Sequence, residues 1–300
     1  MSASRQLPIV TSGQSGEPPI FNKIGIVGLG LIGGSIAIAS RQIWPTGLII
    51  AVDQKEVLEL AMVRHAIDIA ADDLVVLAEA DLVILAAPVL QNIDLLKSLE
   101  THVKGSAVVT DVGSTKREII EAARGISPKF TFVGGHPMAG ATQGGFPNAR
   151  EDLFRGRPWI LTPHDDRSGD AVEKLFQLTK SFGALPQIMN GATHDTMVAS
   201  LSHLPQLTAS ALMAVIGNTI GPEGLALAGR GLVDTTRLAS SPPDIWKDIC
   251  ATNGDEIRVA LDLLVEKLNL LKADLENGDV LDGVFKEASQ WRQELKKKTD

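Results

Sequence analysis

The chain has 300 residues, which is enough for two domains, and its 44% hydrophobic and 21% charged residues are typical of a globular protein with a substantial core. A formal net charge of −8 argues against nucleic acid and against an anionic membrane surface as partners. No uninterrupted run of about 18 apolar residues is present, so we expect no membrane span. We also expect no metal site.

Residues 1–20 are rich in Ser, Gly, Pro and Gln and contain no apolar signal-peptide core, so they predict a disordered tail. The single cysteine, Cys250, cannot form an intramolecular disulfide, which favours a reducing cytoplasm. Its apolar helical surroundings favour core packing over a catalytic thiol.

From Phe21 onward, short apolar runs alternate with amphipathic segments, a pattern typical of βαβ units and a mostly parallel sheet. We expect strands at 23–27, 48–53, 81–86, 107–110 and 131–134, and two more near 159–162 and 184–189. Helices are expected at 33–42, 55–65, 90–102 and 115–124, and around 170–182. The pattern predicts an α/β Rossmann-type dinucleotide-binding domain over residues 21–189.

After about Asn190 the pattern becomes entirely helical, starting with a long helix over 191–216. Apolar residues then recur at spacings of three and four, with charged residues between them. The members of this stripe are Ile257, Leu261, Leu264, Leu268, Leu271 and Leu275. The stripe fits either a domain core or a dimer seam. The long helices favour an all-α domain over residues 190–300 that forms a homodimer.

A glycine fingerprint, G-x-G-x-x-G, directly follows the first expected strand and opens the first expected helix. The first glycine permits a tight turn, the second lets the backbone approach a pyrophosphate, and the third permits close packing of helix and strand. Peptide N–H groups at the helix start bind the anionic phosphates. The residues expected to contact the dinucleotide here are Gly28, Leu29, Gly30, Leu31, Ile32 and Gly33.

Asp53 ends the second strand, 20 residues beyond Gly33. A carboxylate at this position accepts hydrogen bonds from the ribose hydroxyls of NAD and repels the 2′-phosphate of NADP. NAD is therefore the favoured cofactor, although Lys55 could partly offset the repulsion. Ala87 and Pro88 follow a later strand at the same sheet edge, where they either contact the cofactor or form a simple turn.

Ser114 and His136 follow two further strands, and both lie at the carboxyl edge of the sheet, where α/β proteins bind ligands. We expect His136 in a glycine-rich loop after its strand. A histidine that titrates near neutrality, beside a hydroxyl that orients it, can act as a general base toward an alcohol. A purely structural role is the alternative for this histidine.

Six segments together resemble the prephenate/arogenate (cyclohexadienyl) dehydrogenase family, over about 280 residues from Phe21 onward. The segments are GLGLIGGS, DVGSTK, GGHPMAG, LFRGRPWILTP, THD…SHLP and DTTRLASSPPDIWKDI. The resemblance implies NAD-dependent oxidative decarboxylation of prephenate or arogenate on the route to tyrosine. It also implies that His136 is the base toward the ring hydroxyl and that Ser114 shares the hydrogen bond of that hydroxyl.

The same resemblance implies that Arg237 binds a substrate carboxylate and that Trp246 lies near the mouth of the site. Without it, a surface ion pair is the better reading of Arg237, and core packing is equally suitable for Trp246. His194 and His203 match a family helix. Nine residues separate them, about 180° on an ideal helix, so both cannot face one small ligand. Either can be structural, and we favour His203 for the site.

Gln206 stands where many prephenate-using members have a second histidine, assigned to the substrate side chain. We expect Gln206 to bind substrate, but an amide cannot be cationic and should hold a pyruvyl carboxylate less strongly. This departure favours arogenate, or use of both substrates, over strict use of prephenate.

Two other functions are compatible with the overall pattern. A β-hydroxyacid dehydrogenase also joins a Rossmann domain to helices. A resemblance to that class would imply a catalytic lysine on the first long helix of the second domain. Residues 190–219 contain no lysine. A dinucleotide-sensing protein without turnover would keep Gly28, Gly30 and Asp53, yet would have no reason to keep Ser114, His136 and Arg237 together.

Overall fold

The computed structural model describes residues 18–141, 143–164 and 168–297, so residues 1–17 of the expected disordered tail lie outside the described part of the chain. The chain divides into two compact units. The α/β unit runs to Val198 and also includes Ser240–Thr252. The helical unit consists of Ala199–Ala239 and the residues from Asn253 onward. The units are therefore discontinuous in sequence, unlike the single division near residue 190 that we expected.

Within the described residues, the α/β unit is built on an eight-stranded sheet with the order β3-β2-β1-β4-β5-β6-β7-β8. All neighbouring strands are parallel except β6 and β7, which are antiparallel. The strands are β1 (Lys23–Val27), β2 (Leu48–Val52), β3 (Ile69–Ala71), β4 (Leu82–Leu85), β5 (Ala107–Asp111), β6 (Phe130–Pro137), β7 (Pro158–Pro163) and β8 (Leu185–Ile188). Strand order reverses at β1, whose neighbours β2 and β4 lie on opposite sides, and ligands of α/β proteins bind at such a point.

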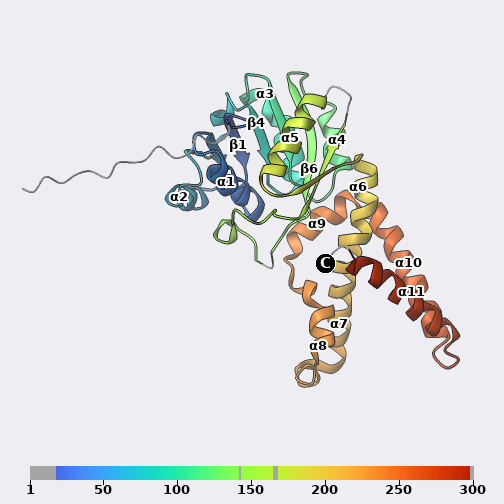
Figure 1. Cartoon of the computed structure of the whole chain (residues 1–300). Helices are drawn as coiled ribbons and strands as arrows, with labels where there is room; N and C mark the ends of the chain where they lie inside the picture. The colour runs from blue at the N-terminus through green and yellow to red at the C-terminus, as the bar shows by residue number, and fades with distance from the viewer. Residues whose placement is uncertain (1–17, 142, 165–167, 298–300) are drawn as a thin grey trace, which may run out of the picture. The chain divides into compact units, whose positions relative to one another are not determined.

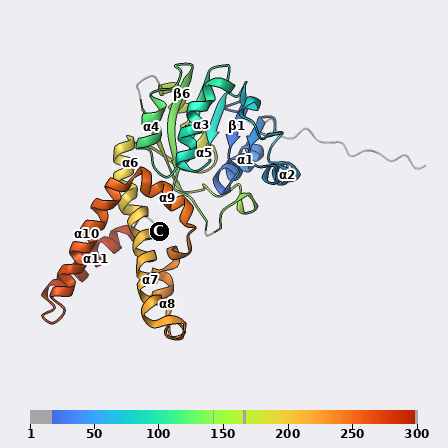
Figure 2. The same cartoon turned by 180° about the vertical axis from the view of Figure 1, so that it is seen from behind.

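Helices cover both faces of this sheet, as Figures 1 and 2 show from opposite sides. One apolar core includes residues of α1 (Leu31–Ile43), α2 (Lys55–Val63) and α5 (Gly169–Ser181), and the other includes residues of α3 (Val89–His102) and α4 (Arg117–Ala123). Burial on both faces explains why the central strands read as continuous apolar runs and not as alternating patterns. Helices α6 (Gly191–Val198) and α9 (Pro243–Thr252) complete the unit.

The expected α/β Rossmann-type fold followed by helices is confirmed, with two local differences. The edge strand β3 was not expected, because a run of only three residues, IAA, is too short to indicate a strand. The expectation that His136 lies in a loop after its strand is wrong: His136 is part of β6. This strand continues beyond its parallel pairing with β5 because Gly134–Pro137 pair with the antiparallel strand β7.

The helical unit contains α7 (Leu204–Leu225), α8 (Arg230–Thr235), α10 (Gly254–Ala273) and α11 (Asp279–Lys296). Residues Ala199–His203 form a π-helical turn that leads into α7. Near its end α7 is broken at Gly221, whose φ of +63° precedes Pro222. Helix α10 packs against the π turn, α7 and α11.

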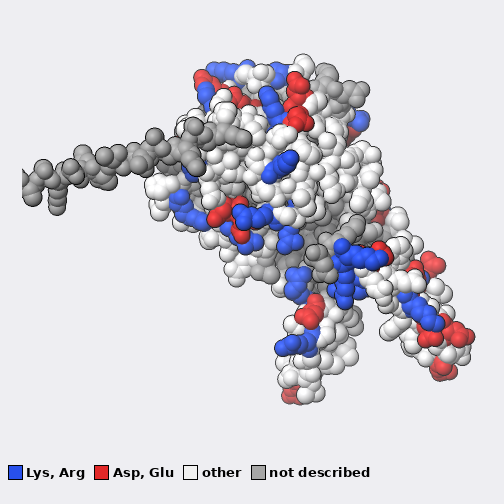
Figure 3. Space-filling model, in the orientation of Figure 1, with Lys and Arg blue, Asp and Glu red and all other residues white. Residues whose placement is uncertain are grey.

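Much of the apolar surface of the helical unit is exposed. In the expected stripe, Ile257 is buried, whereas Leu268 and Leu275 are 53% and 70% exposed. Phe285 and Trp291 on α11 are each 68% exposed. On the face drawn in Figure 3, uncharged surface separates the charged side chains of these helices. Such a surface is typical of a protein–protein contact.

The helical run Gly191–Leu225 is long and apolar enough, by length and composition alone, to cross a membrane. Polar residues such as His194 and Asp195 interrupt this run, so its apolar character is an average and agrees with the absence of an uninterrupted apolar stretch in the sequence. One such helix is weak evidence for a membrane protein, and a helix that packs against another chain has the same composition.

Candidate active site

The loop between β1 and α1 has the geometry of a phosphate-binding turn. Gly28 has a φ of +95°, and a Cβ there would lie 2.8 Å from the carbonyl of Ala86. A Cβ on Gly33 would lie 1.9 Å from the carbonyl oxygen of Gly28. A Cβ on Gly30, by contrast, would meet nothing within 4 Å, at the point where α1 begins. Two glycines thus permit the tight packing, and Gly30 leaves open space at the positive end of a helix, where a phosphate fits.

The other expected cofactor residues lie around this loop. Asp53 follows β2, and its carboxylate accepts hydrogen bonds from the backbone N–H groups of Leu29 and Gln54. Ala87, just after β4, donates its backbone N–H to Oδ1 of the buried Asn92 at 3.1 Å. The structure therefore brings the glycine loop, Asp53 and the Ala87–Pro88 turn together at the reversal of strand order.

Gly34 is a further glycine of this region with a packing role, and it is not among the expected site residues. A Cβ on Gly34 would lie 2.6 Å from the ring of Phe146, in the segment that follows β6. Arg64 lies over the same ring, with its guanidinium carbon 5.2 Å from the ring centroid. Because Gly34 has no side chain, the segment that follows β6 can pack directly on α1, the helix that begins at the glycine fingerprint. The doubled glycine in GLGLIGGS was the available signal.

His136 belongs to a buried chain of hydrogen bonds. Its Nδ1 lies 2.8 Å from Nε2 of His194, and Nδ1 of His194 lies 2.7 Å from Oδ1 of Asp195. Both partners are on α6, which approaches α4 closely because a Cβ on Gly191 would lie only 2.5 Å from Ile120. His136 is 9% exposed, and the other two residues are at most 1% exposed. The structure thus joins His136 to a histidine 58 residues away.

The hydrogen bonds from Asp195 through His194 favour one tautomer of His136. The ionised Asp195 can only accept a hydrogen bond, so Nδ1 of His194 carries a hydrogen and donates it; when His194 is neutral, its Nε2 carries a lone pair. Nδ1 of His136 then donates to that lone pair, and Nε2 of His136 is the basic nitrogen. An anchored imidazole with a defined basic nitrogen is the arrangement required of a general base.

Asp195 is held in its ionised form. Burial alone would raise the pKa of its carboxyl, but hydrogen bonds from His194 and from the backbone N–H groups of Arg117 and Lys116 outweigh burial and lower that pKa. The backbone donors lie 2.8 and 2.9 Å from the two carboxylate oxygens. They belong to the start of α4, directly after the turn that contains Ser114.

A fully buried ion pair between Lys116 and Asp111 supports the same region. Asp111 also accepts the backbone N–H of Gly113 at 2.8 Å and that of Gly135 at 3.1 Å. Burial lowers the pKa of the Lys116 ammonium, while the attraction of Asp111 opposes that shift. Through these contacts the ion pair holds the turn that contains Ser114 next to Gly135, the residue before His136. The positions of Ser114 and His136 therefore both depend on the pair.

Helix α9 lies beside the ends of β4 and β5. The hydroxyls of Thr252 and Thr115 are 2.7 Å apart, and the backbone N–H of Leu90 lies 3.3 Å from Asp248. Trp246, expected near the site, is half-buried on this helix. Cys250 is on the same helix, and burial raises the pKa of its thiol.

The remaining expected site residues belong to the helical unit. His203 is buried, with its Nδ1 3.3 Å from Nδ2 of Asn253. Gln206 is also buried and donates to the carbonyl of Leu238, and Arg237 begins a short 3₁₀ turn, Arg237–Ser240. Of the two family-helix histidines, the structure joins His194 to His136, although His203 was favoured. The role of His203 in the site stays a prediction, and the π turn between the two histidines interrupts the regular helical phase that the 180° argument assumed.

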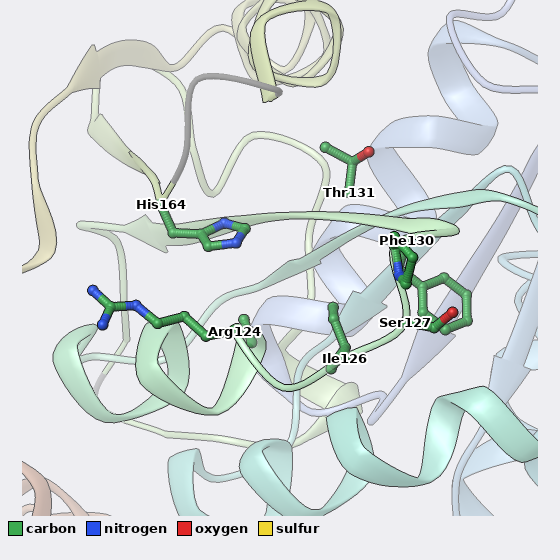
Figure 4. A pocket seen from close by; sticks show the side chains of 8 residues that line it. Arg124, Ile126, Ser127, Phe130, Thr131 and His164 are labelled. Atoms are coloured by element: carbon green, nitrogen blue, oxygen red, sulfur yellow. The ribbon is translucent and has the colours of Figure 1, made fainter.

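Figure 4 shows a pocket near Phe130, at the start of β6, whereas His136 lies near the other end of that strand. Arg124, Ser127, Phe130 and His164 are among its lining residues. Its volume of about 70 Å³ is far below the 300 Å³ or more of typical ligand sites. We assign no function to it.

The glycine loop at the strand-order reversal and the anchored histidine at the same sheet edge define an oxidoreductase with a nucleotide-binding Rossmann domain. The family models for the prephenate dehydrogenase nucleotide-binding domain and dimerization domain match residues 36–186 and 190–288. The chain therefore belongs to the prephenate dehydrogenase family.

Individual relatives agree with this assignment. The prephenate dehydrogenase of Bacillus subtilis (strain 168) is 35% identical over 278 residues, covering 90% of this chain and 75% of that protein. Prephenate dehydrogenase from A. aeolicus, solved with hydroxyphenyl propionate and NAD⁺, is 30% identical with a TM-score of 0.85, covering 91% of this chain and 98% of that one. Synechocystis arogenate dehydrogenase is also 30% identical, with a TM-score of 0.78 and coverage of 91% and 99%.

Proposed function

We propose that this enzyme catalyses the NAD-dependent oxidative decarboxylation of arogenate, prephenate or both, in tyrosine biosynthesis. The observation that carries the proposal is the buried His136–His194–Asp195 chain at the sheet edge that also holds the glycine loop. It supplies a base with a defined basic nitrogen. Membership of the prephenate dehydrogenase family supports a substrate from which such a base would remove a hydroxyl proton.

In the proposed reaction, Nε2 of His136 accepts the proton of the ring C4 hydroxyl, and the hydroxyl of Ser114 orients that group. The C4 hydrogen leaves as hydride, for which NAD, when bound, supplies the acceptor. The ring carboxylate departs as carbon dioxide, and its bonding electrons complete the aromatic ring. Aromatisation makes the step strongly downhill, so the residues have mainly to orient the substrate.

We further propose that arogenate or both substrates are used, in preference to prephenate alone. Gln206 is neutral and cannot supply the cationic partner that favours a pyruvyl carboxylate. The test is the appearance of NADH absorbance near 340 nm with each substrate, and kcat/KM for both substrates with NAD and with NADP. A protein that turned over neither substrate would be a dinucleotide sensor or a different dehydrogenase.

A homodimer formed by the helical unit is part of the same proposal. It is supported by the match of residues 190–288 to a dimerization domain and by the exposed apolar side chains on α10 and α11. We propose a cytoplasmic enzyme, which the single cysteine favours. Small-molecule substrates, with no nucleic acid or membrane partner, agree with the net charge of −8.

Asp53→Ser should shift cofactor preference from NAD toward NADP by tenfold or more in kcat/KM. The substitution removes the carboxylate that repels a 2′-phosphate, and it also removes the acceptor for the backbone N–H of Leu29, so NAD use should weaken. Steady-state kinetics with both cofactors measures the shift. Asp72→Ser, at an exposed position after β3, is the control. Unchanged NAD preference in Asp53→Ser would mean that the ribose contact is elsewhere.

Arg237→Gln should raise KM for the substrate about 10- to 100-fold, because a charge-assisted hydrogen bond to a carboxylate contributes roughly 1.5–3 kcal/mol. KM for NAD should change little. Arg230→Gln, at the exposed start of α8, is the matched control in the same unit. A substrate KM that stays at the wild-type value would remove Arg237 from the site.

A further inference from the structure

Gln206 connects α7 to the turn that begins at Arg237. Its Nε2 donates to the carbonyl oxygen of Leu238 at 2.7 Å and lies 3.3 Å from Oγ of Ser210. The side chain is 5% exposed, so its hydrogen bonds form away from bulk water. The contact with Leu238 joins positions 32 residues apart in sequence, within one compact unit.

The segment that receives this hydrogen bond is a short turn whose residues are at least partly exposed. Arg237–Ser240 is a single 3₁₀ turn without a buried side chain, and such turns have weaker hydrogen-bond geometry than α-helices. Local backbone bonds hold it from one side, with Thr236 N–H donating to Leu232 and Ala239 N–H to Thr236. The amide of Gln206 attaches the turn to the long helix α7.

We propose that Gln206 is a positioning residue that sets the location of the Arg237 guanidinium through the Leu238 carbonyl, in place of the direct substrate contact expected from the sequence. The inference rests on the proposed role of Arg237 in binding a substrate carboxylate. Prephenate and arogenate carry the same two carboxylates. They differ in the side chain, where prephenate has a keto group and arogenate has an ammonium group. Loss of the Gln206 hydrogen bond therefore weakens binding of both substrates equally, whereas a direct side-chain contact would discriminate between them.

The principal variants are Gln206→Met, which keeps the length of the side chain without its N–H donors, and Gln206→Asn, which keeps the amide but withdraws it from Leu238. We expect each to raise KM for both substrates by a similar factor of about 5–10, with kcat nearly unchanged. Ser210→Ala is the matched control, because it removes only the longer contact of the same amide, and it should behave like wild type.

A double-mutant cycle then tests the route through Arg237. In an Arg237→Gln background, Gln206→Met should add little to the rise in KM, because the group that Gln206 positions is already gone. Additive effects of the two substitutions, or a rise in KM for only one substrate, would overturn the proposal and indicate direct contact. An unchanged KM in Arg237→Gln alone would instead refute the assigned role of Arg237, and with it the route from Gln206.

Hydrogen exchange supplies a readout that does not depend on turnover. In Gln206→Met and Gln206→Asn, amides of residues 236–240 should exchange faster than in wild type, while those of β5 and β6 stay unchanged. Wild-type exchange rates at 236–240 in both folded variants would overturn the positioning role even if the enzyme is active. Faster exchange in a protein that turns over neither substrate would leave the positioning role standing and refute the proposed function.

Discussion

His136→Asn should lower kcat by about two to four orders of magnitude, because it removes the proposed general base. The asparagine amide can still donate to Nε2 of His194, so the buried chain keeps a hydrogen bond at this position and the fold should be retained. The Kd for NAD should stay close to the wild-type value, because the glycine loop and Asp53 are unchanged. Stopped-time or steady-state assays give kcat, and calorimetric titration gives the Kd.

The matched control is His164→Asn, which makes the same substitution at a histidine near the opposite end of the sheet, with its Nδ1 3.2 Å from the carbonyl oxygen of Phe132. It should leave kcat within about twofold of wild type. If His136→Asn lost cofactor binding and turnover to the same degree, His136 would be a structural residue. A normal kcat would assign the base to another group.

Lys116→Met should destabilise the protein by about 3–5 kcal/mol, because it leaves the buried carboxylate of Asp111 without its cation. This is a large part of the 5–15 kcal/mol that stabilises a typical domain. Urea unfolding monitored by circular dichroism measures the loss, as a decrease in the midpoint concentration of urea. The double variant Lys116→Met/Asp111→Asn should recover part of it, since the amide is neutral, but its single oxygen can accept only one of the N–H groups of Gly113 and Gly135, which bond different carboxylate oxygens.

Lys23→Met provides the comparison for this prediction. Lys23 also pairs with a carboxylate, Glu79, but this pair is exposed to solvent and should contribute little to stability. Equal midpoints for Lys23→Met and Lys116→Met would contradict the structural importance that we assign to the buried pair. A double variant no more stable than Lys116→Met would contradict the unpaired charge as the main cause and indicate that lost packing, or the N–H group left without an acceptor, outweighs it.

Three features could be predicted from the sequence because each depends on residues that are close along the chain. They are the glycine fingerprint, the apolar runs of the central strands and the apolar stripe at 257–275. A G-x-G-x-x-G between strand and helix is a local geometric requirement, and Gly28 and Gly33 do occupy positions where a Cβ would collide with backbone. The fold class followed from the order of these local patterns. The edge strand β3 was missed because its three residues acquire strand geometry only by pairing with β2.

The candidate site was readable only in part. His136 and Ser114 were recognised through the motifs around them, but no local pattern indicates that His194 and Asp195 anchor His136. No local pattern indicates that Lys116 is completely buried beside Asp111, which also accepts N–H groups from Gly113 and Gly135. Gln206 is expected by analogy to contact substrate, which stays a prediction, and only the structure shows that its Nε2 donates to the Leu238 carbonyl.

The sequence alone therefore determined the dinucleotide loop, the α/β class and the identity of the candidate base, because those features are written in residues that are neighbours along the chain. Tertiary structure decided that His136 lies on a strand, through pairing with the antiparallel β7, and that Asp195 anchors it through His194. Hydrogen bonds across 58 residues and burial of a lysine depend on how distant segments pack, and packing is a property of the whole fold.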